Sequence, residues 1–161
     1  MERVLVPLDG SALAEEALPH AKRLASRFAG TIFLIRVIPT AQQLASASFA
    51  NASGMQGVPP IDIESVDKIV EIQLEEARAY LTEVTRKIQS EGIRAEWEVR
   101  EGTSAEVIIE CAREKKVDAI VISSHGRSGL GRLVFGSVAD RVIRDSGIPV
   151  MVIKPSKGRE S

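Results

Sequence analysis

Apolar runs that alternate with amphipathic stretches recur along this chain, and this alternation constrains the fold more than any other feature. Five runs have the length of strands, and they span residues 4–6, 31–38, 94–100, 118–122 and 149–153. Residues 31–38 are nearly all apolar, which is typical of a strand covered on both faces, whereas 94–100 alternates apolar and charged residues like a strand near an edge. Because strands that alternate with helices form parallel sheets with right-handed crossovers, the order predicts an α/β domain with helices on both faces.

The segments between the strands carry the start and stop signals of helices. Ser11 is placed to cap a first helix that Gly30 ends. Residues 63–89 have one apolar stripe opposite a charged face, which predicts a long amphipathic helix. The capping-box spacing over 103–106 opens a third helix, and Ser137 begins a fourth.

One segment does not fit this alternation. From Pro39 to Ile61 the chain has no charged residue and is dominated by Ala, Ser, Gln, Gly and Pro, so we expect no fixed structure there. Residues 39–62 are then a flexible insertion that acts as a lid or as a partner-binding segment, and composition does not choose between these. We expect one domain over residues 1–155 and a polar C-terminal tail over 156–161.

Composition and charge exclude several classes of function. Lys and Arg number 21 against 22 Asp and Glu, and aromatic residues make up 4%, so the chain lacks both the basic field and the stacking platforms that bind nucleic acid. No apolar run reaches the roughly 18 residues of a membrane span. Cys111 is the one cysteine, which excludes an intrachain disulfide and favours a cytoplasmic location; we expect it to be an inert core thiol.

Two strand ends carry the chemistry of a ligand site. In parallel sheets, ligands bind beyond the carboxyl ends of the strands, where the strand order reverses. Pro7–Gly10 follows the first strand, and the glycine-rich segment 123–136 joins the fourth strand to a helix. Glycine lets main-chain amides approach an anion and a helix N-terminus adds positive charge, so this segment predicts phosphate binding. Arg127 and Arg132 would add charge, and Ser137 would bind a phosphate oxygen or cap its helix.

The standard nucleotide motifs do not match this segment. Gly126-x4-Gly131 is followed by Arg132-Leu133, so the Lys and Ser/Thr of a P-loop are missing, and Gly129-x-Gly131 lacks the third glycine of the dinucleotide fingerprint. His125 is expected to pack or hydrogen-bond rather than catalyse. We assign no catalytic residue and no metal-ligating residue, which predicts a binding module with at most slow nucleotide hydrolysis.

The glycine-rich segment resembles the signature of the universal stress protein family, Gly-x2-Gly-x9-Gly-(Ser/Thr). Here the signature falls on Ser123, Gly126, Gly136 and Ser137, with serine in place of the first glycine. The opening Val-Pro-x-Asp-Gly-Ser and the closing Gly-Ser-Val and Pro-Val-x-Val-Ile also occur in the family's order, so the resemblance covers almost the whole chain. It implies a Rossmann-like sheet with strand order 3-2-1-4-5, a homodimer and, in members that bind it, ATP.

The resemblance implies a nucleotide site formed by Pro7, Leu8, Asp9, Val37, Ile122, Ser123, Gly126, Arg127, Gly136, Ser137 and Val138. The Asp9 carboxylate would accept from the ribose hydroxyls, and the backbone of Val37 would meet the adenine edge. Ile122 and Ser123 would form the floor, and the last five residues would enclose the phosphates, which would hold Mg²⁺ or Mn²⁺ together with water. On sequence alone, we expect Gly136→Val to obstruct the phosphates and to leave the melting of the apo protein unchanged.

Other interpretations stay open. Asp9 is also a common turn residue, and Ser123 with the missing P-loop lysine favours a family member that binds no nucleotide and acts through dimerisation or an unidentified protein partner. A nucleotidyl-transfer or hydrolytic enzyme is a further alternative. If the strand order is that of the family, Val150, Met151, Val152 and Ile153 lie at the sheet edge, where an apolar strand would pair with a second copy.

Overall fold

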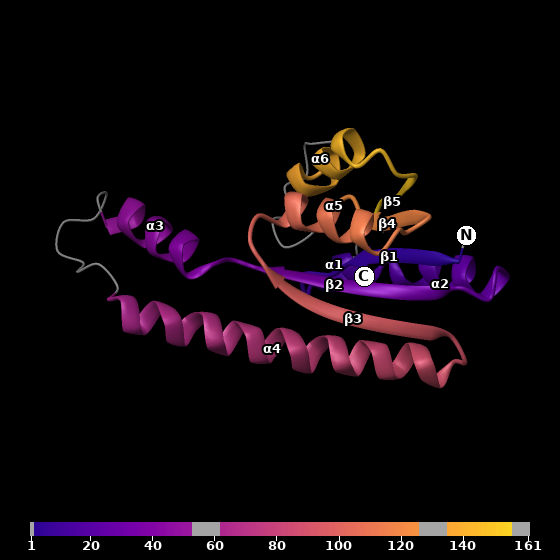
Figure 1. Cartoon of the computed structure of the whole chain (residues 1–161), viewed down its shortest axis with the longest axis horizontal. Coiled ribbons are helices and arrows are strands. Elements are labelled where there is room, and N and C mark those ends of the chain that lie inside the picture. Colours follow the sequence, from indigo (N-terminus) through magenta and orange to yellow (C-terminus); the bar gives the residue numbers. More distant parts are fainter. Residues whose placement is uncertain (1, 53–61, 126–134, 156–161) are drawn as a thin grey trace, which may run out of the picture.

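One parallel sheet forms the centre of the molecule in the computed structural model, which describes residues 2–52, 62–125 and 135–155. Its strands are β1 (Arg3–Pro7), β2 (Thr31–Ile38), β3 (Arg94–Glu101), β4 (Ala119–Ser123) and β5 (Val150–Ile153). Neighbouring strands are parallel and their order is β3-β2-β1-β4-β5 (Figure 1). This confirms the predicted parallel sheet, its strand order and the edge position of the charged third strand.

Helices cover both faces of this sheet, as predicted. They are α1 (Ala12–Glu15), α2 (Leu18–Arg27), α3 (Ala41–Ala52), α4 (Ile63–Ser90), α5 (Ser104–Glu114) and α6 (Ser137–Asp145). α1, α2 and α4 pack on one face and α5 and α6 on the other (Figure 1). Leu34 and Ile35 are neighbours in β2 but belong to opposite cores, because successive side chains of a strand point to opposite faces.

The helix predicted between Ser11 and Gly30 is in fact two helices. The Ser11 hydroxyl accepts from the amide of Ala14 at 3.1 Å and caps α1, which ends after a single turn. α2 then begins at Leu18 with Pro19 in its first turn. Because proline has no N–H, it cannot continue the hydrogen bonds of a preceding helix, but it fits the first turn of a new one.

The expectation of no fixed structure after Pro39 is wrong for residues 41–52, which form α3. The Thr40 amide donates to Gln43 Oε1 at 2.8 Å and the Gln43 amide donates to Thr40 Oγ1 at 3.1 Å, so the two residues form a reciprocal capping box. Four alanines follow in a helix-favouring sequence. Residues 53–61 lie outside the described residues, and the role of the segment as a lid stays a prediction.

The long helix over 63–89 is confirmed as α4, which is capped by the Asp62 side chain through the amide of Ser65 at 2.8 Å. α3 packs against its first half, and both extend beyond the sheet as an arm (Figure 1). In the described part of the chain, no helix is both long and apolar enough to cross a membrane.

The start of α5 is as predicted, but its capping box does not form. Thr103 is the N-cap residue and its side chain makes no capping bond. Its hydroxyl accepts instead from Gln43 Nε2 at 3.2 Å, while Glu106 accepts from Arg141 at 2.7 Å. The side chains of Thr103 and Glu106, which the sequence predicted to cap α5, therefore make tertiary contacts instead. The contact of Thr103 with Gln43 joins the first turn of α3 to the start of α5.

Candidate functional site

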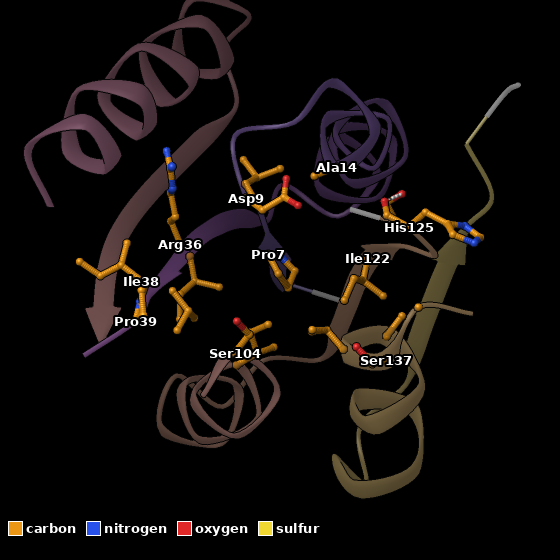
Figure 2. A pocket seen from close by; sticks show the side chains of 18 of the residues that line it. Pro7, Asp9, Ala14, Arg36, Ile38, Pro39, Ser104, Ile122, His125 and Ser137 are labelled. Atoms are coloured by element: carbon orange, nitrogen blue, oxygen red, sulfur yellow. Dashed lines mark hydrogen bonds between the residues drawn. The ribbon is translucent and has the colours of Figure 1, made fainter. Parts of the chain in front are cut away.

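A cavity of about 490 Å³ lies at the carboxyl edge of the sheet, over the ends of β1, β2 and β4 (Figure 2). The strand order reverses there, because the chain leaves β1 for β2 on one side and later enters β4 on the other. Nine of the predicted contact residues line this cavity: Pro7, Leu8, Asp9, Val37, Ile122, Ser123, Gly136, Ser137 and Val138. Gly126 and Arg127, the other two, and Arg132 lie outside the described residues.

Asp9 is fixed by the turn that follows β1. Its Oδ1 accepts from the amide of Ser11 at 2.9 Å, and Gly10 between them has a φ of 84°, a left-handed conformation that favours glycine. Asp9 therefore has the structural role in the turn that the sequence analysis considered. Asp9 also lines the cavity, so the same bond that makes the turn holds a carboxylate at the wall of the site.

At the end of β4, the side chains of Ser123 and Ser124 bond to His125. The Ser123 hydroxyl donates to the carbonyl of His125 at 2.8 Å, and Ser124 Oγ lies 2.8 Å from His125 Nδ1. Ser123 is the residue that departs from the family signature, and its hydroxyl serves the turn. His125 makes the hydrogen bond expected of it, although its Nε2 is buried with no protein partner among the described residues.

The N-terminus of α6 faces the same cavity through Ser137, Val138 and Ala139. Gly136 is the N-cap residue, so the N-cap position supplies no side chain to this end. The first amides of a helix have no acceptor within it, and they carry the positive end of the helix dipole. An anion in the cavity would therefore meet donors and a favourable field at this wall.

Gly136 itself has a structural role. Its amide donates to the carbonyl of Ser124 at 2.6 Å, so this amide is already used by the fold. A Cβ added at position 136 would lie 2.9 Å from the same carbonyl oxygen. The close approach of two backbone segments thus requires glycine, and the expectation that a side chain here leaves apo melting unchanged disagrees with this contact.

A polar wall of the cavity was missed by sequence reasoning. Arg36 of β2 and Gln73 and Glu76 of α4 line it, as does Ser104 at the start of α5. Arg36 had a signal, since it is the one charged residue in the apolar run 31–38. Gln73 and Glu76 had none, because polar residues on one side of an amphipathic helix look like ordinary solvent-facing residues.

The described residues bring together no recognisable catalytic or metal-binding set. No group of three or more His, Cys, Asp or Glu side chains among them could hold a metal ion. Cys111 is buried on α5 and donates from Sγ to Glu98 Oε1 at 2.8 Å. Burial, together with this hydrogen bond, raises the pKa of the thiol to about 12, which keeps it protonated near neutral pH.

Comparison with known proteins extends these observations. The chain matches the family model described as Universal stress protein family over residues 1–154. It is 33% identical over 156 residues to Universal stress protein MJ0531 of Methanocaldococcus jannaschii, covering 97% of this chain and 84% of that protein. It is 28% identical over 153 residues to Universal stress protein MJ0577 of the same organism, covering 95% and 94% of the two chains.

Solved structures show the same fold. The structure of MJ0577 superposes with a TM-score of 0.81 at 25% identity and covers 98% of both chains. Universal stress protein UspA from Lactobacillus plantarum superposes with a TM-score of 0.75 at 19% identity, covering 94% and 97%. Because the family match spans nearly the whole chain and the parallel sheet has the predicted order, the chain belongs to the universal stress protein family.

Proposed function

We propose that the cavity binds an adenine nucleotide, ATP together with Mg²⁺ or Mn²⁺, and that the chain works as a nucleotide-responsive homodimer. One observation carries the proposal: Asp9 and the N-terminus of α6, whose N-cap residue is a glycine, line the same cavity, with the apolar residues Pro7 and Ile122 beside them. A nucleotide combines an apolar base, ribose hydroxyls that donate hydrogen bonds, and an anionic phosphate chain. A volume of about 490 Å³ is in the range of small-molecule sites.

Each part of the nucleotide has a suitable partner. The Asp9 carboxylate would accept from ribose hydroxyls, and the amides at the start of α6 would donate to phosphate oxygens. The cation would be held mainly by phosphate oxygens and water, since the described residues offer no cluster of three potential metal ligands. Two proteins that share this fold were solved with cAMP and, from Archaeoglobus fulgidus, with dAMP, at 24% and 23% identity to this chain.

Titration calorimetry with MgATP tests the proposal. We expect saturable binding by the wild type, and a roughly 10- to 100-fold weaker Kd in Asp9→Asn, because a hydrogen bond to a charged group contributes about 1.5–3 kcal/mol. Asparagine keeps an oxygen for the Ser11 amide, so the turn should survive. The matched control is Asp67→Asn on the exposed side of α4, which should bind like the wild type. A wild type that shows no binding at millimolar ATP would refute the proposal.

Failure of that test would favour the alternative, a family member without nucleotide that acts through dimerisation and protein contacts. The bonds that occupy the Ser123 hydroxyl and the Gly136 amide are the observations on its side. An enzyme of nucleotidyl transfer or hydrolysis would instead show turnover faster than about one per second, within the usual enzyme range. We expect slower turnover, because the described residues present no base or nucleophile set.

The proposed response would reach the surface through α3. Pro39 and Ser104 line the cavity, and Gln43 of α3 bonds to Thr103 beside Ser104. A ligand in the cavity would therefore contact both sides of the joint between α3 and α5 and alter the surface offered to a protein partner. A single buried cysteine suits a reducing compartment such as the cytoplasm.

The proposed dimer would form along β5. The two ends of the sheet differ, since β3 carries charged residues at alternate positions, which discourage edge pairing, whereas β5 is wholly apolar. Met151 is 38% exposed and Val150 and Val152 are half-buried, which leaves apolar surface for a second copy. Ile153 is buried in the core of its own chain and would contribute least.

Light scattering tests the dimer. We expect twice the chain mass for the wild type at micromolar concentration and a monomer for Met151→Lys. Glu96→Lys at the opposite edge is the matched control and should keep the wild-type mass. A monomeric wild type would refute the dimer without affecting the nucleotide proposal.

A further inference from the structure

A group of polar contacts outside the predicted site borders the turn that carries Asp9. It consists of Gly10 in the turn, Glu15 at the end of α1, Arg36 in β2 and Tyr80 in α4, and we call it the Tyr80 clamp. These residues come from four separate parts of the chain, and only Arg36 among them lines the cavity.

The contacts of the Tyr80 clamp are specific. The Tyr80 hydroxyl donates to Glu15 Oε1 at 2.8 Å. The guanidinium carbon of Arg36 lies 5.5 Å from the centre of the Tyr80 ring, within the range of a cation–π interaction. The same guanidinium packs on the turn, since a Cβ added at Gly10 would be only 3.2 Å from Arg36 Nη1.

The clamp contacts the Asp9 turn and the short helix that follows it. Arg36 lies against the turn at Gly10, and Tyr80 bonds to Glu15 at the end of α1. Two local bonds connect Asp9 to α1, from the Ser11 amide to Asp9 Oδ1 and from the Ala14 amide to the Ser11 hydroxyl. Figure 2 shows Asp9 and Arg36 on the same side of the cavity.

Tyr80 is suited to a fixed role as a donor. Burial, followed by the hydrogen bond to Glu15, raises the pKa of its phenol well above the ordinary value of 10.0, so the hydroxyl stays protonated. The negative charges of Glu15 and, least, of Asp9 also raise this pKa, whereas the positive charge of Arg36 lowers it.

We propose that the Tyr80 clamp orients the Asp9 carboxylate and thereby makes the cavity select nucleotides with intact ribose hydroxyls. Tyr80 and Glu15 act as positioning residues, since they do not line the cavity, whereas Arg36 forms part of its wall. The inference rests on the proposed nucleotide function. Its physical basis is that a carboxylate accepts a ribose hydroxyl well only when its position is fixed to within about half an ångström by surrounding contacts.

The test compares MgATP with Mg-2′,3′-dideoxy-ATP by calorimetry, because the second ligand lacks both hydroxyls. We expect the wild type to prefer ATP by about 10- to 100-fold, the size of one hydrogen bond to a charged acceptor. Tyr80→Phe removes only the bond to Glu15. It should weaken the binding of ATP and change the Kd of dideoxy-ATP less than about twofold, so that the preference for ATP falls about 3- to 10-fold. Tyr80→Leu also removes the ring beneath Arg36 and should reduce the preference further.

Glu83→Gln is the matched control on α4, since Glu83 bonds to Arg86 on the exposed side of the helix. It should keep the wild-type preference. If the wild type prefers ATP and Tyr80→Phe retains the full preference, the clamp is refuted while the nucleotide function stands. Equal loss for both ligands in Tyr80→Phe would also refute it, because a general structural defect does not distinguish them. A wild type that binds neither ligand overturns the proposed function and this inference together.

Discussion

Gly136→Ala should destabilise the protein even without ligand. The added Cβ would lie 2.9 Å from the carbonyl oxygen of Ser124, and neither atom can rotate away, because the backbone of residue 136 fixes the Cβ and the oxygen is itself a backbone atom. The conformation of Gly136, with φ −67° and ψ 158°, is open to any residue, so the cost is steric and not torsional. Overpacking of this kind costs about 1–3 kcal/mol, which at about 2–4 °C per kcal/mol for a chain of this size lowers Tm by roughly 2–12 °C.

Gly30→Ala provides the matched control. A Cβ at position 30 would lie 2.8 Å from the carbonyl oxygen of Glu2, a clash of the same kind at the opposite edge of the sheet from the cavity. Both variants should therefore lose similar stability in a thermal melt. Only Gly136→Ala should also weaken ATP binding, by about tenfold, because relief of its clash moves the first amides of α6.

Two results would contradict this reasoning. An unchanged Tm for Gly136→Ala would show that the approach to Ser124 is not needed for stability. Wild-type affinity for ATP in a Gly136→Ala protein with a lowered Tm would show that the start of α6 does not hold the phosphates.

Three further outcomes follow from buried or bonded groups. Leu81 is fully buried, so Leu81→Ala should lower the free energy of unfolding by about 2–5 kcal/mol in a urea titration, and a loss below about 1 kcal/mol would contradict its core role. The Cys111 thiol should not react with a disulfide reagent in the folded protein at mildly alkaline pH and should react after unfolding, since burial raises its pKa to about 12; rapid native-state labelling would contradict this. Hydrogen bonds from the amides of Arg3 and Glu2 lower the pKa of Asp118 below its ordinary value of 3.8. Asp118 therefore contributes to the free energy of unfolding above pH 3.8, and this contribution is lost as the pH falls through the lowered pKa. Urea titrations from about pH 5 to about pH 2 should therefore show a smaller loss of stability in Asp118→Asn than in the wild type.

Local patterns sufficed for the central elements of the fold. The run 31–38 coincides with β2, and the apolar stripe of 63–89 gave α4 to within one residue, because burial on a sheet or along a helix imposes periods that are visible in any window. The prediction for residues 41–52 was wrong, because it was made from amino-acid composition and not from the spacing of apolar residues. An uncharged, Ala- and Ser-rich segment looks like a linker, yet Thr40 and Gln43 cap a helix there, and packing on α4 supplies what an isolated helix lacks.

The candidate site likewise has a part that local sequence patterns predicted and a part that they did not. Its glycine-rich signature and Asp9 were visible because they follow strands whose carboxyl ends must meet at one edge of a parallel sheet. Arg36, Gln73 and Glu76 join the same cavity from two elements far apart in the chain, and no local rule connects them.

The sequence by itself determined the α/β class, most elements and the edge of the sheet where a ligand would bind, since hydrophobic period and glycine placement act over a few residues. Only the tertiary structure decided that the Gly136 amide is used by Ser124, that the cap of α5 is given up for contacts with α3 and α6, and that the Tyr80 hydroxyl donates to Glu15 at the end of α1. Each of these depends on which distant groups compete for the same donor or acceptor, and that competition exists only once the chain has folded.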